Sequence, residues 1–325
     1  MHFPAFLLYY PPMRMKHSLG KYAIFLGILA GAVALSLLTA PSQRKTRVQW
    51  PVMGTVAAIT FRGGSPEDQD ATRVKVRAVW DELENRLSAW SPTSDLSRLA
   101  PLLATEGEAA LSSVPTAERP CYSFAFDLKR QSRGAFDPVI GEAMRHAGFT
   151  RVSAVDLGAV AKGFAVDRAW ALLSPNDNLL LDLGGNLRAH GGVWRTGVRN
   201  PFASNAFAAA FELLDGEAVA TSGNYERFVE RNGKRYSHIL DPRTGESVSG
   251  IAGVTVVAPT ALLADGLSTT LFVLGPDEGV KFLAAHYPGV AALWIPDTPE
   301  NPLIIATTAM AARLMDSSFA IETRR

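Results

Sequence analysis

"VTVVAPTALLADGLSTTLFVLG", residues 254–275, predicts a strand followed by an apolar helix that begins at about Ala261. Asp265 is the one charged residue in this stretch. A carboxylate within a core helix needs a partner, because burying an unpaired charge is costly. The stretch therefore places a strand and a helix in the core, and it marks Asp265 as a position with a role beyond packing.

Asp265 and Thr269 are four residues apart, so they lie on one face of the predicted helix. A carboxylate and a hydroxyl at this spacing supply two of the hard oxygen ligands that magnesium prefers. The alternative is that Asp265 lies at the surface and that Thr269 only packs. Taken alone, the pair favours this alternative; the apolar surroundings shift the balance towards the metal site, because a lone buried carboxylate needs a partner.

The other segments alternate between strands and helices. We predict a strand at 52–61, in which Gly54 marks a bulge or a close backbone approach, and a helix capped by Ser65. The stretch 155–173 predicts a short strand, a glycine turn and a helix, whereas 179–192 predicts two strands joined by a tight reversal. This pattern indicates an α+β domain of mixed, mainly antiparallel sheets with packed helices.

The turn at Asp156 leads into a helix that carries Lys162 near its start. A helix N-terminus with a lysine in its first turn suits a phosphate group. The spacing does not match a P-loop, and it lacks the Gly-x-Gly-x-x-Gly fingerprint of a dinucleotide-binding fold. A strand-to-helix turn held by glycines is an equally good interpretation at this point.

"YSHILDPRTG", residues 236–245, places His238 just before a turn that contains Pro242 and Gly245. It is one of six histidines in the chain. Taken alone, the stretch favours a structural histidine over a catalytic one. The same Asp-Pro-x-x-Gly frame occurs at 137–141, but it is too short to establish a duplicated half.

The composition is that of a folded protein, with 325 residues, 47% of them hydrophobic and 19% charged, and a net charge of +1. This balance argues against a nucleic-acid partner. The single cysteine, Cys121, excludes an internal disulfide, a four-cysteine zinc site and an iron–sulfur cluster.

The N-terminal region predicts export. A basic leader, 1–21, precedes an uncharged run at 22–38 that suits a signal anchor or a signal peptide, and a buried core helix is the alternative. Basic residues before the run keep that end in the cytoplasm. We therefore expect 39–49 to form a linker and 50–325 to form one domain beyond the membrane, whether or not the run is cleaved.

Segments between about residues 50 and 310 resemble the ApbE family, the FAD:protein FMN transferases. The segments that carry this resemblance are VMGTVAAITF (52–61), LSAWSPTSDLSRL (87–99), GAFDPVIG (134–141), VDLGAVAKGFAVDRA (155–169), LDLGGNLRAHGG (181–192), VWRTGVRNP (193–201), ATSGNYERFVERNGKRYSHILDPRTG (220–245) and VTVVAPTALLADGLSTTLFVLG (254–275). The resemblance implies a T-fold-like ApbE domain that binds FAD and Mg²⁺. It also implies a location in the bacterial cell envelope, at the periplasmic face of the inner membrane.

The resemblance further implies the site residues. Asp265 and Thr269 would bind magnesium through their side chains, and Ala159 through its backbone carbonyl. His238 stands where the family has its active-site histidine, and Asp156 is a second candidate for the base; the sequence does not decide between them. The residues expected to contact FAD are Met53, Trp90, Ala135, Phe136, Asp137, Asp156, Lys162 and Ile239.

Two features depart from the family pattern. Val139 stands where the family usually has a threonine, so one polar contact near the flavin is expected to be missing. The lipobox cysteine is absent, which leaves any anchoring to residues 22–38.

The resulting hypothesis is a magnesium-dependent enzyme that cleaves FAD, attaches FMN through a phosphoester to a threonine or serine of an acceptor protein, and releases AMP. The acceptor is expected to be a subunit of an envelope redox complex, and the N-terminal segment is expected to contact the inner membrane. The alternatives are a FAD-binding protein that transfers nothing, a pyrophosphatase that yields FMN and AMP, and an assembly factor for a respiratory enzyme.

Overall fold

The structure is a computed structural model that describes residues 45–149, 153–225, 228–231 and 234–324. These residues belong to one compact unit, Lys45–Arg325. The predicted leader at 1–21 and the predicted membrane segment at 22–38 lie outside the described residues. Within the described part of the chain, no helix combines the length and the apolar character that a membrane crossing requires.

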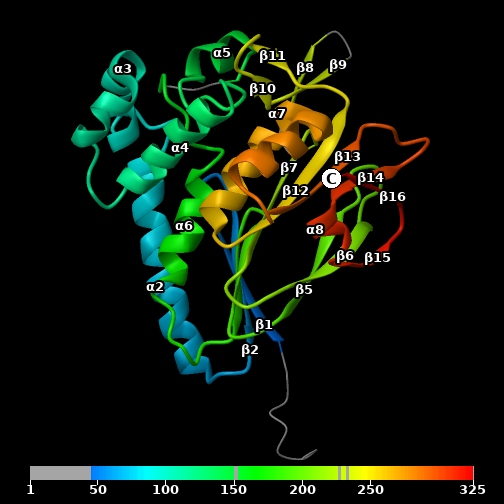
Figure 1. The fold of residues 1–325 in the computed structure, drawn as a ribbon. Coiled ribbons are helices and arrows are strands. Elements are labelled where there is room, and N and C mark those ends of the chain that lie inside the picture. The colour runs from blue at the N-terminus through cyan, green and yellow to red at the C-terminus, as the bar shows by residue number, and fades with distance from the viewer. Residues whose placement is uncertain (1–44, 150–152, 226–227, 232–233, 325) are drawn as a thin grey trace, which may run out of the picture. The chain divides into compact units, whose positions relative to one another are not determined.

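A large twisted sheet forms the centre of the domain (Figure 1). Over the described residues it contains nine strands in the order β1-β2-β3-β4-β7-β12-β13-β14-β16. Neighbours are antiparallel except for the parallel pair β14 and β16, which confirms the prediction of an α+β fold with mainly antiparallel strands. The strands are β1 (Lys45–Val52), β2 (Thr55–Arg62), β3 (Leu179–Leu183), β4 (Asn186–His190), β7 (Ala218–Gly223), β12 (Ile251–Ala258), β13 (Ala291–Pro296), β14 (Leu303–Thr307) and β16 (Ala320–Arg324).

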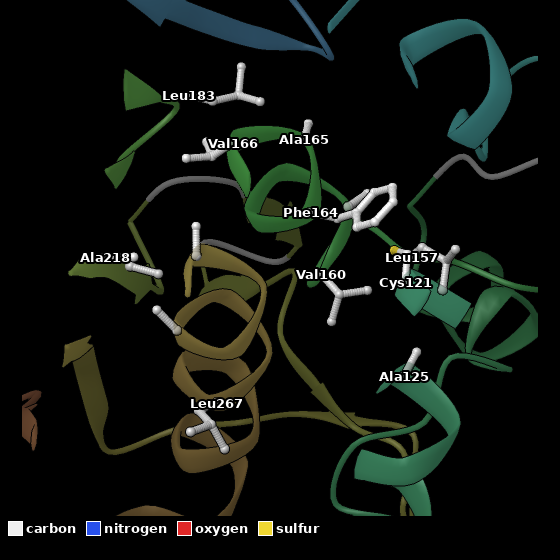
Figure 2. Close-up of a cluster of buried hydrophobic side chains, with 14 of the residues drawn as sticks. Cys121, Ala125, Leu157, Val160, Phe164, Ala165, Val166, Leu183, Ala218 and Leu267 are labelled. Atoms are coloured by element: carbon white, nitrogen blue, oxygen red, sulfur yellow. The ribbon is translucent and has the colours of Figure 1, made fainter. Parts of the chain in front are cut away.

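Helices cover one face of this sheet. Helix α6 (Ala161–Trp170) contacts β3 and β4, and helix α7 (Ala261–His286), which is interrupted at Gly275, contacts β7 and β12. Figure 2 shows the apolar cluster beneath them, to which Val160, Phe164 and Leu267 contribute. The other helices on this side are α2 (Pro66–Leu87), α3 (Asp95–Glu106), the 3₁₀ helix η1 (Gly107–Ser113), α4 (Arg119–Gln131) and α5 (Gly141–His146).

A smaller sheet covers the opposite face of the large one. Its strands lie in the order β15-β6-β5, and a short helix, α8 (Thr308–Ala311), packs against β13 and β14. Two hairpins complete the described part of the domain. The bounds are β5 (Trp194–Arg199), β6 (Phe207–Leu213), β15 (Leu314–Ser317), β8 (Phe228–Arg231), β9 (Lys234–Ser237), β10 (Leu240–Asp241) and β11 (Glu246–Ser247).

Strand β12 is buried along its whole length because both of its faces meet a core. Val254 and Val256 pack in the core under the helices, whereas Ala252 and Val257 pack in the core between the two sheets. Successive side chains of a strand point to opposite faces, so one apolar run serves both layers. This explains why the run that begins at residue 254 is apolar apart from Thr255, whose buried hydroxyl lies 2.9 Å from that of Thr221.

Several local predictions are confirmed. Ser65 caps α2 by accepting a 3.1 Å hydrogen bond from the Asp68 amide. Helix α7 begins at Ala261 as expected, and the Thr260 side chain accepts from the Leu263 amide. Strands β3 and β4 form the expected tight hairpin at 179–190.

The strand predicted at 52–61 is wrong in its first part, because the chain reverses there. Met53 and Gly54 both have positive φ, at 51° and 65°, and they form a two-residue turn between β1 and β2. Two positive φ angles are what a hairpin turn that matches the strand twist requires. Gly54 therefore serves a turn rather than a bulge.

The predicted linker at 39–49 and the predicted strand after residue 155 also need correction. Residues 45–49 belong to β1, whose polar side chains are the solvent-facing positions of a strand paired with β2. Val155 and Leu157 are buried but form no ladder, because Asp156 bends the chain by accepting a 2.8 Å hydrogen bond from the Gly158 amide. Helix α6 still follows this turn, as predicted.

Candidate active site

Helices α6 and α7 approach each other closely at Gly163. A Cβ atom at this position would lie 2.2 Å from the Ala261 carbonyl oxygen, so only glycine fits. The Gly163 amide donates a 2.9 Å hydrogen bond to Oδ2 of Asp265. This packing brings the start of α6, with Lys162, against the predicted metal ligand on α7.

Asp167 fixes the same two helices one turn further along α6. Its carboxylate oxygens accept hydrogen bonds of 2.8 and 2.9 Å from the amides of Ala261 and Leu262, the first residues of α7. Arg188 of β4 forms an ion pair with it at 2.7 Å. A carboxylate at a helix N-terminus accepts hydrogen bonds from otherwise unpaired amides and interacts favourably with the helix dipole. Asp167, which sequence reasoning missed, therefore helps to set the position of Asp265.

Asp265 is only 4% exposed. Burial raises the pKa of its carboxyl, and the Lys162 ammonium, the Gly163 amide and the Asn186 side chain oppose that rise only in part. Lys162 Nζ lies 3.7 Å from Asp265 Oδ1 and donates a 2.8 Å hydrogen bond to the Gly158 carbonyl oxygen. The protein alone therefore leaves the Asp265 carboxylate incompletely compensated, and a cation would stabilise it.

Asn186 is a buried polar neighbour of Asp265 that the sequence analysis did not single out. It starts β4, is 3% exposed, and its Nδ2 donates a 3.3 Å hydrogen bond to the Leu183 carbonyl oxygen. Its Oδ1 has no hydrogen-bond partner among the described residues. A buried amide oxygen in this state points to a ligand. The available signal was an asparagine directly after Gly184-Gly185, a stretch we had interpreted as a hairpin alone.

Thr269 lies one turn after Asp265 on α7, so the two predicted ligands share a helix face. The Thr269 hydroxyl lies 3.2 Å from Oγ of Ser222, at the end of β7. Ser222 Oγ in turn lies 2.8 Å from Oγ of Ser268. This chain of hydroxyls ties the predicted metal-binding face of α7 to the end of the sheet.

The oxygen donors at the start of α6 and on α7 suit a hard cation. They are the Asp265 carboxylate, the Thr269 hydroxyl and the Ala159 carbonyl in the turn before α6, with the Asn186 oxygen nearby. No cluster of three or more histidine, cysteine or acidic side chains that could hold a metal occurs in the described part of the chain. Magnesium commonly uses one or two carboxylates together with substrate phosphates. The donor set therefore fits magnesium better than a metal held by histidines or cysteines.

The loop at 134–141 lies beside the loop at 153–156. The Asp156 amide donates a 2.8 Å hydrogen bond to the Pro138 carbonyl oxygen, and the Gly141 amide donates a 2.9 Å bond to the Ala154 carbonyl oxygen. These bonds hold the backbones of the two loops together. Among the predicted flavin residues, they bring together Ala135, Phe136, Asp137 and Asp156.

Trp90 lies next to this region, whereas Met53 lies in the β1–β2 turn. Trp90 is 50% exposed and follows Ala89, whose carbonyl oxygen accepts a 3.2 Å hydrogen bond from the Ser153 amide. Met53 occupies the β1–β2 turn at a φ of 51° and packs against the core under the helices. A non-glycine residue at positive φ stores strain, which makes Met53 a candidate for function.

His238 lies between β9 and β10, and the backbone on both sides of it is held in place. The Ile239 amide donates a 3.1 Å hydrogen bond to Oγ of Ser237, and the Ser247 hydroxyl donates a 2.6 Å bond to the Ser237 carbonyl oxygen. The Val248 amide also donates a 3.0 Å bond to the Ile239 carbonyl oxygen. The β10–β11 hairpin therefore fixes the position from which the His238 side chain projects.

The two Asp-Pro segments form the same local turn. Asp137 Oδ1 accepts from the Val139 amide at 2.8 Å, and Asp241 Oδ1 accepts from the Arg243 amide at 2.9 Å. The hydrogen bond from the Arg243 side chain also lowers the pKa of Asp241. A Cβ atom at Gly134 would lie 3.7 Å from Cγ of Arg243, so the two turns adjoin. Valine at 139 keeps the backbone bond, which needs no hydroxyl.

A chain of hydrogen bonds links the loop residues to the helix residues. Asp156 Oδ1 accepts from the Gly158 amide at 2.8 Å, and the Gly158 carbonyl oxygen accepts from Lys162 Nζ at 2.8 Å. The predicted flavin loops, the helix N-terminus and the predicted metal ligands are therefore parts of one connected arrangement.

Comparison with known proteins shows which family the chain belongs to. The model of the ApbE family matches residues 53–154 and 150–294, which together make up most of the chain. The chain belongs to the ApbE family. The FAD:protein FMN transferase of Treponema pallidum is 29% identical to it over 333 aligned positions, covering 83% of this chain and 90% of that protein. The enzyme of the same name from Haemophilus influenzae is 28% identical over 310 positions, covering 78% of this chain and 88% of that protein.

Solved ApbE structures share the fold. The apo form of the Pseudomonas stutzeri flavinyl transferase ApbE aligns with a TM-score of 0.66 at 25% identity, covering 84% of this chain and 98% of that one. The Vibrio cholerae flavin transferase ApbE aligns with a TM-score of 0.69 at 23% identity, covering 83% of this chain and 100% of that one. The mixed α+β architecture is thus that of ApbE proteins.

Proposed function

We propose that this protein is a FAD:protein FMN transferase. Membership of the ApbE family carries the proposal. Lys162 and Asp265, which meet where α6 packs on α7, and Thr269, one turn further along α7, support it. In the reaction, the P–O–P bond of FAD breaks and an acceptor hydroxyl oxygen bonds to the phosphorus of the FMN half. AMP leaves, and the hydroxyl proton passes to a base.

Neutralising the negative charge of the FAD diphosphate is the first task of the site, because that charge repels an oxygen nucleophile. Lys162 and the N-terminus of α6 offer positive charge to the phosphates. Asp265, Thr269 and the Ala159 carbonyl would hold magnesium, which when bound would neutralise further charge on the diphosphate and on the departing AMP.

A base is needed because a threonine hydroxyl is a poor nucleophile at neutral pH. Asp156 accepts a hydrogen bond from the Gly158 amide and so shapes the turn that presents Lys162. His238 projects from a segment that the β10–β11 hairpin holds in place. We therefore assign proton removal to His238 and a positioning role to Asp156.

The cellular setting is part of the proposal. The basic leader and the uncharged run at 22–38 support export to the periplasmic face of the inner membrane, tethered or released. The acceptor would then be a subunit of an envelope redox complex in the same compartment. Fusing residues 1–44 to a reporter enzyme that is active only after export tests this point. We expect an active reporter, and an inactive reporter that stays in the cytoplasm would contradict export.

The test of the activity is to incubate the full chain with FAD, magnesium and an acceptor protein that carries a target threonine. We expect flavin fluorescence on the acceptor in a denaturing gel and AMP in solution. Release of AMP and free FMN without labelling would indicate a pyrophosphatase instead. Bound FAD without any AMP would indicate a binding protein. An acceptor in which alanine replaces the threonine is the control.

A further inference from the structure

A separate cavity opens at the end of the large sheet, on the side of the smaller sheet. Its volume is about 460 Å³, within the range of about 300–1,000 Å³ that is usual for ligand pockets. Its lining includes Phe202 and Ala252, which pack in the core between the two sheets. The cavity therefore lies across the sheet from α7 and its predicted metal ligands.

The cavity is nonetheless close to those ligands. The Tyr225 ring forms part of its lining and lies against Gly223, where a Cβ atom would come within 2.6 Å of the ring. Gly223 pairs with Gly253 across β7 and β12, so two glycines make room for the ring. The preceding residue, Ser222, points to the other face and lies 3.2 Å from the Thr269 hydroxyl. One step along β7 thus separates the cavity from a predicted metal ligand.

The cavity also shares a wall with the His238 segment. Ser237 and Ser247 both line it, and the hydrogen bond between them fixes the backbone next to His238. A molecule seated in the cavity would therefore lie next to the segment that carries the residue assigned as the base.

The chemistry of the lining selects the kind of molecule. Among the described lining residues, the charged group is the carboxylate of Asp297, which accepts a 3.2 Å hydrogen bond from Asn224. Serine hydroxyls and the aromatic rings of Phe202 and Tyr225 make up much of the remainder. This mixture suits an uncharged or basic polypeptide segment.

We propose that this cavity seats the stretch of the acceptor protein next to its target threonine or serine. The proposal rests on the proposed function, because a transferase must bind a protein as well as FAD. The acceptor chain would lie between Phe202 and Ser247 of the β10–β11 hairpin, with its positively charged or uncharged flank at Asp297. From there it would pass over the end of β7 to bring its hydroxyl to the diphosphate.

Binding without chemistry tests this proposal directly. The probe is a fluorescently labelled acceptor whose target threonine is replaced by alanine, and its Kd for the full chain is measured by anisotropy. Asp297→Lys reverses the charge of the cavity, and Ser249→Trp fills it. We expect each to raise the acceptor Kd at least about tenfold, because both introduce a repulsive element. The Kd for FAD should stay unchanged.

Matched controls make the same changes beside the cavity. Glu300→Lys and Ser204→Trp alter exposed residues that do not line it, and each should change the acceptor Kd less than about twofold, as exposed sites usually do. Thermal unfolding of all four variants shows whether each is folded.

The outcomes distinguish a failure of the docking proposal from a failure of the proposed function. An acceptor Kd that is equal for the wild type and both cavity variants, or the absence of acceptor binding to the wild type, overturns the docking proposal. If the wild type labels the intact acceptor while the cavity variants label it equally well at low acceptor concentration, only the docking proposal fails. If the wild type binds the acceptor but never labels it, the proposed function fails.

Discussion

The two faces of the large sheet have cores of different character. Under α6 and α7, the core includes the carboxylate of Asp265 and the amide of Asn186, each less than a twentieth exposed. Between the two sheets, the cluster is built of apolar side chains such as Phe211, Leu293 and Ile304. Burying polar groups costs stability unless something pairs with them. The buried polar groups under the helices suit the proposed metal site, whereas the core between the sheets, away from the cavity that Phe202 and Ala252 line, serves the fold.

This contrast predicts that substitutions on the two faces have different consequences. Changes at the polar positions under the helices should reduce activity more than stability. Changes in the core between the sheets should reduce stability and leave the activity of each folded molecule intact. The experiments below, ordered from the largest expected effect to the smallest, can break this contrast or sharpen it.

Asp265→Ala should have the largest effect. It removes a predicted metal ligand, and losing metal-assisted charge neutralisation of several kcal/mol corresponds to about a thousandfold fall in transfer rate. Initial rates of acceptor labelling across a magnesium titration measure it. Asp277→Ala, on an exposed part of the same helix, is the matched control and should retain full activity. Normal magnesium-dependent activity in Asp265→Ala would show that the metal assignment is wrong.

Phe211→Ala should lower the free energy of unfolding by about 3 kcal/mol, since it leaves a cavity in the core between the sheets. Urea unfolding measures this change. Phe207, on the same strand, is 66% exposed, so Phe207→Ala should have a much smaller effect. The activity of each folded Phe211→Ala molecule should match the wild type. If well-folded Phe211→Ala protein lost activity, the proposed difference between the two faces of the large sheet would be wrong.

His238→Ala should slow transfer about a hundredfold while FAD binding is kept, because general base catalysis contributes about that much or more. The rate of acceptor labelling and the quenching of FAD fluorescence measure the two effects separately. The matched control is His146→Ala, an exposed histidine at the end of α5. An unchanged rate would return His238 to a structural role.

Asp265→Asn should have a small effect on metal-free protein, in the stabilising direction. Burial raises the pKa of Asp265, because the folded protein disfavours its charged form. The metal-free wild type therefore keeps its full stability in acid, where the carboxyl is protonated, and loses part of it as the pH rises through the folded-state pKa. Melting temperatures in EDTA should therefore be higher for Asp265→Asn at neutral pH, and the gap should close in acid.

Asp241→Asn should change the melting temperature in the opposite direction. The Arg243 hydrogen bond lowers the pKa of Asp241, so the carboxylate stabilises the fold above its unfolded-state pKa and loses this effect as the pH falls through the folded-state value. Asp241→Asn should melt below the wild type at neutral pH, with the difference fading in acid. If both variants changed the melting temperature in the same direction at neutral pH, burial would not be the main cause of the raised pKa of Asp265.

Much of the fold follows from local signals that the sequence carries. The cap at Ser65, the glycine pair of the β3–β4 hairpin and the apolar helix from Ala261 each depend on nearby residues alone. The Met53 turn did not follow, because a methionine at positive φ is locally unfavourable and is imposed by the pairing of β1 with β2. Pairing between distant strands cannot be deduced from one segment.

The candidate site divides in the same way. The helical spacing of Asp265 and Thr269 and the place of Lys162 at a helix start were evident from the sequence, and the family resemblance added Ala159. Asp167 and Asn186 were missed because their importance arises from contacts between residues far apart in the chain. Such contacts exist only once α6, α7 and β4 are packed together.

The most direct test of the central claim is the intact mass of the acceptor after incubation with the full chain, FAD and magnesium, together with the amount of AMP released. The account predicts an acceptor heavier by one FMN minus one water, with one AMP for each modified acceptor. It also predicts no mass change when alanine replaces the target threonine. AMP and free FMN beside an acceptor of unchanged mass would contradict it.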